Sequence, residues 1–225
     1  MKKQLYLLLI TCSILIAKNN NLVEQRAVID ERTVHRTGDY GLICQNANGT
    51  YNPDMEDYVY SPTIDIPAGD EVSVDFLVRG SMLDPDDFPN VDYWGMQISP
   101  DGGDSWFYVS NPYGDTTGTF PNYVYTDAPE IWSLFSTVYS TPIDIDNYAA
   151  TTVQLRYWFH SDSDAPQGEG LFLDDISVNV DGEDIYFESF EDSTMAGWVS
   201  VDQTSTEPAW HQDTYGAYGG SGQSW

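Results

Sequence analysis

Along several short segments of this chain, apolar side chains alternate with polar ones, and this period of two restricts the fold more than any other feature. Successive side chains of a β-strand point to opposite faces, so each segment predicts a strand with one face on a core. The stripes are Val72/Val74/Phe76/Val78, Val153/Leu155/Tyr157/Phe159, Trp94/Met96/Ile98 and the shorter Phe107/Val109. No segment beyond the N-terminus has an amphipathic helical pattern. The sequence therefore predicts an all-β, antiparallel β-sandwich or jelly roll.

The apolar phase slips by one position within residues 171–180, at Asp174-Asp175. A β-bulge at this point restores the pattern and turns one carboxylate in a new direction. Calcium prefers hard oxygen ligands such as carboxylates, so Asp174 and Asp175 are candidate calcium ligands. The alternative is that the two residues form a solvated bulge.

The charge balance is strongly acidic, with 8 basic and 36 acidic residues and a net charge of -28. From Thr37 onward, the basic residues are Arg79 and Arg156 alone. Such a surface repels phosphate backbones, which argues against nucleic-acid binding, and it disfavours anionic membranes. It attracts divalent cations, although a general role in solubility explains the same charge.

The N-terminus has the pattern of a secretory signal, because Lys2-Lys3 precede an apolar run from Leu5 to Ala17. We predict a signal peptide over residues 1–17, with lipidation at Cys12 as the less favoured alternative, and a linker or degenerate leader over residues 18–32. No later segment is apolar enough to span a bilayer. The protein is therefore expected to be secreted or displayed at the cell surface. Removal of Cys12 would leave Cys44 alone, without a disulfide framework.

Two pairs of similar segments indicate a repeated design. Ser61–Ile66 resembles Ser140–Ile145, and each contains a proline that suits an edge strand or the start of a strand. Val34–Gly41 resembles Trp210–Gly216. From the second pair we predict one sandwich module over residues 33–181 and the start of a second, truncated module over residues 182–225. The alternative is that residues 185–201 fold back and complete the first sheet.

The order of several motifs resembles that of the MAM-like jelly-roll modules of secreted bacterial proteins. These motifs are Tyr60-Ser61-Pro62-Thr63-Ile64-Asp65-Ile66, Ser99-Pro100-Asp101-Gly102-Gly103-Asp104-Ser105-Trp106 and Gly170-Leu171-Phe172-Leu173-Asp174-Asp175-Ile176. Similar modules occur in immune inhibitor A-type metallopeptidases and in the cleaved-adhesin domains of gingipains. The resemblance covers residues 33–181, although an opening Phe-Glu-Asp strand is missing before His35. It implies a galactose-binding-like, non-catalytic sandwich that binds proteins or glycans, often with structural calcium, and it implies Glu191 and Asp192 as further calcium ligands.

The remaining motifs favour binding over catalysis. The chain has no His-Glu-x-x-His zinc motif, no Gly-x-Ser-x-Gly elbow and no phosphate-binding loop. A single Asp-box at residues 99–106 predicts a hairpin turn in which Asp101 caps backbone N–H groups and Trp106 packs beneath. Trp158, on the outward face of its strand, and Trp132 are candidates for a sugar-binding platform; packing in the core or between modules is the alternative.

Together these patterns predict a non-enzymatic extracellular accessory or adhesion module of a larger protein. Its expected partners are an extracellular protein or glycan and neighbouring modules of the same polypeptide. Two alternatives stay open at this stage. One is a non-catalytic fragment of an immune inhibitor A-like metallopeptidase, and the other is a carbohydrate-binding module of a secreted hydrolase.

Overall fold

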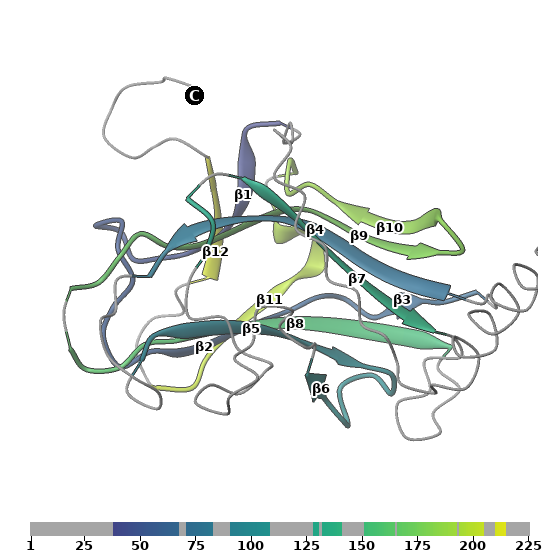
Figure 1. Ribbon diagram of the computed structural model, residues 1–225, viewed down its shortest axis with the longest axis horizontal. Helices are drawn as coiled ribbons and strands as arrows, with labels where there is room; N and C mark the ends of the chain where they lie inside the picture. The colour runs from purple at the N-terminus through teal and green to yellow at the C-terminus, as the bar shows by residue number, and fades with distance from the viewer. Residues whose placement is uncertain are drawn as a thin grey trace, which may run out of the picture.

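Two antiparallel sheets pack face to face in the computed structural model (Figure 1). The structure describes residues 38–67, 71–82, 91–108, 128–130, 132–140, 151–164, 166–192, 194–204 and 210–214. The predicted signal peptide, the predicted linker and Cys12 lie outside these ranges. The all-β antiparallel sandwich predicted from the alternating stripes is confirmed.

Sheet A has the strand order β12-β1-β9-β4-β7, with β10 also paired to β9. Its strands are β1 (Tyr40–Cys44), β4 (Glu71–Ser81), β7 (Ser133–Ser140), β9 (Gly170–Val180), β10 (Glu183–Glu188) and β12 (Trp210–Thr214). Sheet B has the order β11-β2-β8-β5-β6, with β3 paired to β8. Its strands are β2 (Glu56–Tyr60), β3 (Ile64–Asp65), β5 (Tyr93–Ser99), β6 (Phe107–Tyr108), β8 (Thr152–His160) and β11 (Val199–Asp202). A short 3-10 helix, η1 (Met195–Gly197), precedes β11.

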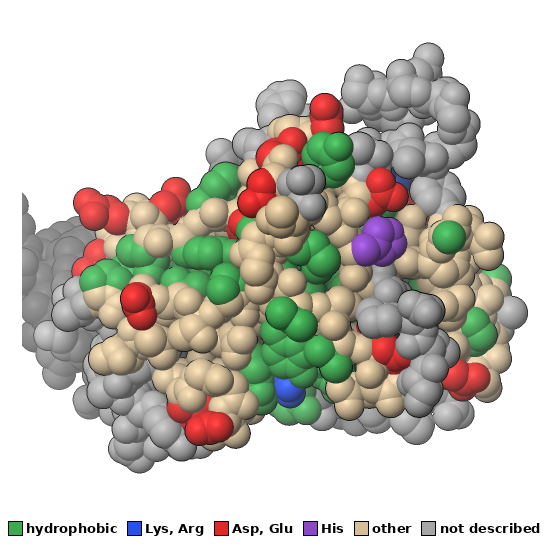
Figure 2. Space-filling view, turned by 180° about the vertical axis from the view of Figure 1, so that it is seen from behind, with side chains coloured by type: hydrophobic (Ala, Val, Ile, Leu, Met, Phe, Trp, Pro, Cys, Tyr) green, Lys and Arg blue, Asp and Glu red, His purple; other side chains and the backbone are tan. Residues whose placement is uncertain are grey.

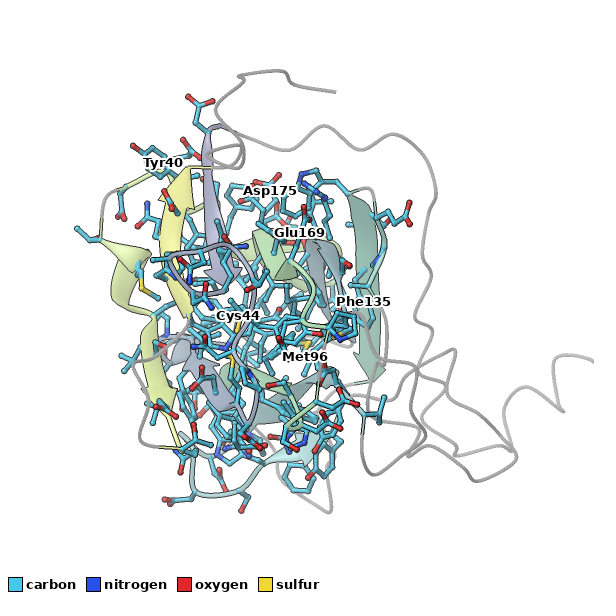
Figure 3. The ribbon with its side chains drawn as sticks, turned by 90° about the vertical axis from the view of Figure 1, so that its left-hand side faces the viewer. Tyr40, Cys44, Met96, Phe135, Glu169 and Asp175 are labelled. Atoms are coloured by element: carbon cyan, nitrogen blue, oxygen red, sulfur yellow. The ribbon has the colours of Figure 1, made fainter. Side chains whose placement is uncertain are left out.

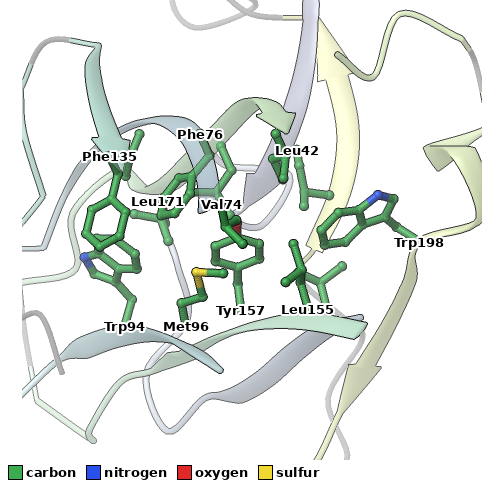
Figure 4. Packing of buried hydrophobic residues seen from close by; sticks show 14 of the residues in the cluster. Leu42, Val74, Phe76, Trp94, Met96, Phe135, Leu155, Tyr157, Leu171 and Trp198 are labelled. Carbon is green, nitrogen blue, oxygen red and sulfur yellow. The ribbon is translucent and has the colours of Figure 1, made fainter. Parts of the chain in front are cut away.

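The core lies between the sheets and consists of the side chains that the period of two places inward (Figure 4). Every member of the three longer predicted stripes is buried there. Phe76 is at the centre, stacked on Phe135 at 4.6 Å and edge-on to Tyr157 at 5.1 Å between ring centroids. Phe107 of the short stripe packs against this core, and Val109 lies outside the described residues. Burial of apolar surface on this scale is the main stabilising contribution to such a sandwich.

The predicted bulge at Asp174-Asp175 is confirmed. On β4, Asp75 pairs with Ser177 and Leu77 with Asp174, so two residues of β9 oppose the single residue between them. Asp175 takes a positive φ of 46°, and the slip returns the apolar side chains on both sides of it to the core. The bulge also marks a change of partner: β9 pairs with β1 before it and with β10 after it.

The segment C-terminal to residue 181 differs from the predicted second module. Its strands β10, β11 and β12 pair with β9, β2 and β1, which all belong to the predicted first module. Trp198 and Trp210 of this segment are buried in the shared core. Among the described residues, the strands on both sides of residue 181 therefore belong to the same two sheets.

Three smaller predictions concern Cys44, membrane-spanning helices and the two proline-containing segments. Cys44 is a free thiol buried in the core. Its pKa lies well above the usual value, mainly because the thiol is buried and also because Asp57 is negatively charged. Among the described residues, no helix has the length and apolar character needed to cross a bilayer. The first proline-containing segment contributes β3, whose Ile64 pairs with Val153; the second lies outside the described residues apart from Ser140.

Candidate functional site

The outer face of sheet B, turned away from the core, carries a group of aromatic rings. On β2, Tyr58 and Tyr60 alternate with the buried Asp57 and Val59, so both tyrosines point outward. The register places Tyr60 opposite Arg156 and Tyr58 opposite Trp158 on β8. Trp106 and Tyr108 come from the β5–β6 hairpin on the far side of β8. We call the outer face formed by Tyr58, Tyr60, Trp106, Tyr108, Arg156 and Trp158 the aromatic face.

The Asp-box turn holds Trp106 in this place. Asp101 Oδ1 accepts hydrogen bonds from Ser105 N and Ser99 Oγ, both at 2.8 Å, and Ser99 Oγ also accepts one from Gly103 N. Gly102 and Gly103 have φ values of 74° and 98°, a region that favours glycine. The backbone hydrogen bond from Ser105 lowers the pKa of Asp101. The turn chemistry predicted from the sequence is therefore confirmed, and its consequence is that Trp106 lies beside Tyr60, at 5.6 Å between ring centroids.

Arg156 lies at the centre of the aromatic face. Its guanidinium carbon is 4.2 Å from the ring centroid of Trp106, 5.0 Å from that of Tyr58 and 5.8 Å from that of Tyr60. Its Nε donates a hydrogen bond to Gln97 Oε1, and Nη1 donates a longer one of 3.4 Å to the Tyr60 hydroxyl. Contacts with ring faces and an amide hold the guanidinium plane in one orientation.

A second polar group lies further along the same face. Glu56 accepts a 2.7 Å hydrogen bond from the Tyr58 hydroxyl at Oε1 and pairs with His160 Nδ1 at 2.7 Å through Oε2. Burial raises the pKa of Glu56, but the hydrogen bonds from His160 and Tyr58 and the nearby positive charges outweigh this and lower it. Burial and the bond to Glu56 raise the pKa of Tyr58. His160 stacks on Tyr93 at 4.5 Å, which extends the aromatic face to the neighbouring strand.

Trp158, a predicted ligand-binding residue, points outward as its strand pattern indicated but is only 4% exposed. Its ring lies on Gly95, where a Cβ atom would come within 2.2 Å of Cη2, and Tyr108 packs edge-on against it at 5.5 Å. Trp158 therefore supports the aromatic face from beneath and is not itself exposed to solvent. Trp132, the other predicted platform residue, directly precedes β7 of sheet A.

The four predicted calcium ligands lie around the bulge of β9. Asp174 is fully buried and its Oδ1 accepts the N–H of Asp175 at 2.8 Å. Glu191 Oε1 accepts the N–H of Tyr40, at the start of β1, at 2.7 Å. Its carboxylate fills the space beside Gly38, where a Cβ atom would lie 1.9 Å from Glu191 Cδ. Tyr40 and Asp175 both lie near the top of the view in Figure 3, above the core residues Cys44 and Met96.

Glu188, which the sequence analysis did not single out, belongs to the same region. It pairs with Ile176 directly after the bulge, and its Oε1 accepts the N–H of Phe190 at 2.6 Å. Burial, and then the charge of Asp192, raise the pKa of Glu188 against the lowering effect of the Phe190 hydrogen bond. We call Asp174, Asp175, Glu188, Glu191 and Asp192 the acidic corner.

Three carboxylates of the acidic corner already accept hydrogen bonds from backbone N–H groups. Asp192 Oδ1 accepts hydrogen bonds from the backbone N–H and the hydroxyl of Thr194. One oxygen each of Asp174, Glu191 and Asp192 is therefore bound to a backbone N–H group. Within the described ranges, no group of three His, Cys, Asp or Glu side chains is arranged to hold a metal ion. Calcium at this corner therefore stays a prediction from the sequence and from the family resemblance.

Of the aromatic face, the sequence indicated Trp158 as a binding residue and Trp106 as part of a turn, but not the two tyrosines of β2. Tyr58 and Tyr60 alternate with Asp57 and Val59, so a short strand with two outward tyrosines was visible in the sequence. Their meeting with Trp106 depends on β2 and the Asp-box hairpin lying on either side of β8, which no local pattern reveals.

The fold and these surfaces define an all-β protein built as a two-sheet antiparallel sandwich. A comparison with protein-family models finds no match, and a search of curated proteins finds no significant relative.

Proposed function

We propose that this protein is a non-catalytic extracellular module that binds glycans on the aromatic face of sheet B. The observation that carries this proposal is the set of partly exposed rings around Arg156. Tyr108 is 49% exposed, and Tyr58, Tyr60, Trp106 and Arg156 are half-buried. Sugars present apolar C–H faces and polar hydroxyl groups on the same ring. Aromatic side chains with polar neighbours match both surfaces.

The aromatic face is also prepared for binding before a ligand arrives. Gln97 and Trp106 fix the Arg156 side chain, and Glu56 fixes the Tyr58 hydroxyl. Side chains that are already ordered lose little conformational entropy on binding, so more of the contact energy appears as affinity. A module that adheres to a polysaccharide or a cell-surface glycan needs this kind of fixed surface.

The extracellular and accessory parts of the proposal rest on the sequence. They are supported by the predicted signal peptide over residues 1–17, by the lack of a recognised catalytic motif and by the resemblance to MAM-like modules. Attachment to a larger secreted or cell-surface protein belongs to the same proposal.

The test is a binding screen of the full chain on an array of neutral and acidic oligosaccharides, followed by titration of the best ligand. We expect Trp106→Ala and Tyr108→Ala each to weaken binding about tenfold or more, since central aromatic contacts dominate such interfaces. The matched control is Phe187→Ala, because Phe187 is an aromatic side chain of sheet A that is 52% exposed. Melting curves of all variants check that the fold is kept.

Three outcomes would contradict the proposal. The first is an array without bound glycans, and the second is equal weakening by Phe187→Ala and the two aromatic-face variants. The third is the release of cleavage products from a bound glycan, which would show that the chain is an enzyme. Capture of a protein ligand that ignores the aromatic-face variants would favour a protein-binding module instead.

A further inference from the structure

Arg156 differs from the other described arginine in how its charge is satisfied. Arg79 forms an ion pair with Glu169 at 2.9 Å, donates from Nε to the carbonyl of Glu130 and packs on Phe172. In the described part of the chain, no carboxylate forms an ion pair with Arg156, whose partners are an amide, a hydroxyl and three rings.

The hydrogen-bonding capacity of Arg156 is only partly used. A guanidinium carries five N–H donors in one plane. Nε is taken by Gln97 and one donor of Nη1 by the Tyr60 hydroxyl, so the remaining donors of the two terminal nitrogens make no hydrogen bond to the described residues. Trp106 packs against one side of the group at 4.2 Å, and Arg156 is half-buried, so the edge that carries the unused donors is where a ligand would bind. That edge matches a carboxylate, which accepts two parallel N–H bonds.

The charges around this position favour one acidic group over many. The charge of Arg156 reaches Glu56 on the same face, because Arg156 is one of the groups that lower the pKa of Glu56. Both Glu56 oxygens already bond, to the Tyr58 hydroxyl and to His160, and the negative charge of Glu56 repels any carboxylate of a ligand beyond the one that Arg156 binds. A densely charged polyanion would still meet the acidic remainder of the surface, where Figure 2 shows acidic side chains spread around a hydrophobic patch that includes a basic group.

We propose that the aromatic face selects glycans that carry an isolated carboxylate, such as a single uronic acid residue, and that Arg156 binds this carboxylate through the edge of its guanidinium. This inference rests on the proposed glycan-binding function and adds the class of ligand. Trp106 and Tyr60 then hold the sugar rings on either side of the charged group.

The experiment compares matched pairs on an array of oligosaccharides that each contain one glucuronic or galacturonic acid, presented as the free acid and as its methyl ester. The ester has nearly the same shape without the charge. We expect the full chain to bind the free acids about tenfold more tightly than the esters, as for a hydrogen bond to a charged group. Oligogalacturonides with a carboxylate on every residue should bind less tightly than the single-acid probes.

The variants Arg156→Lys and Arg79→Lys complete the test. Arg156→Lys keeps the positive charge but loses the fork, so it should reduce the preference for acid over ester about tenfold while binding of the esters is retained. Arg79→Lys, in the other sheet, should keep the preference. Equal binding of acids and esters by the wild-type chain would overturn this inference and leave glycan binding intact, whereas a lack of all glycan binding would overturn both proposals.

Discussion

Glu188 is a single side chain whose charge opposes the fold. It ends β10 beside Asp192, and burial together with that neighbouring charge raises its pKa above the usual value. A carboxyl group with a raised pKa in the folded state stabilises the fold most at low pH. This contribution is lost as the pH rises through the folded-state pKa. The charge of Glu188 therefore costs stability at neutral pH.

We predict that Glu188→Gln is more stable than the wild-type chain at pH 7, because the amide mimics the protonated acid and can still accept the Phe190 N–H. Solvent screening limits the gain to less than about 4 °C in Tm. The difference should shrink as the pH falls through the acid range, because the wild-type carboxyl then becomes protonated in both the folded and the unfolded state. Thermal melting at several pH values measures this. The control is Glu183→Gln, at the exposed start of the same strand. A Tm of Glu188→Gln below that of the wild-type chain at pH 7 would contradict the prediction.

The same melting experiment tests the predicted calcium site. A cation that binds only the folded state raises Tm. If calcium binds at the acidic corner, it should stabilise the wild-type chain, and Asp174→Ala should abolish that effect. Identical melting curves in calcium and in a chelator would remove the calcium prediction.

At the scale of one element, the extra residue in β9 decides which side chains reach the core. Leu171 and Leu173 precede the bulge, and Ile176 and Val178 follow it with the opposite phase, yet all four are fully buried. The bulge also lies where β9 exchanges β1 for β10 as its neighbour. A regular strand would turn one half of β9 outward.

We predict that deletion of Asp175 prevents stable folding. Without it, the residues from Ile176 to Val180 shift by one position and their apolar side chains face solvent. Each loses about 1.5–3 kcal/mol of burial energy, and the sum is comparable to the total stability of a domain. Urea unfolding followed by circular dichroism measures the effect. The control is Asp175→Gly, which keeps the number of residues and suits the positive φ, so its free energy of unfolding should stay within about 1 kcal/mol of wild type. A deletion variant as stable as Asp175→Gly would disprove the role of the bulge.

At the scale of the whole molecule, the C-terminal segment adds strands to both sheets and side chains to the core between them. β12 extends sheet A beyond β1, and β11 extends sheet B beyond β2. Between them, Trp198 stacks on Tyr157 at 6.0 Å, Phe190 packs edge-on against Trp198, and Trp210 is buried with Cys44 as its paired residue. These contacts join the C-terminal segment to the centre of the sandwich.

We predict that a chain ending at Asp181 does not fold cooperatively. Removal of these rings opens a large cavity and exposes strand edges, and loss of one buried Trp or Phe alone costs about 3–5 kcal/mol. Urea unfolding and binding of a hydrophobic dye compare the truncated chain with a chain that ends after Thr214. A sharp unfolding transition of the shorter chain would show instead that residues 33–181 are an independent module.

The sequence by itself determined which faces of the strands meet the core, because the period of two is a local property of an extended backbone. It also located the bulge, since the slip at Asp174-Asp175 is visible in the order of apolar residues, and it predicted the Asp-box turn from side chains that bond only to their neighbours. The tertiary structure decided which strands lie side by side. Strand pairing joins residues far apart in the chain, so it alone placed Trp106 beside Arg156, covered Trp158 at Gly95 and returned the C-terminal strands to the first sandwich.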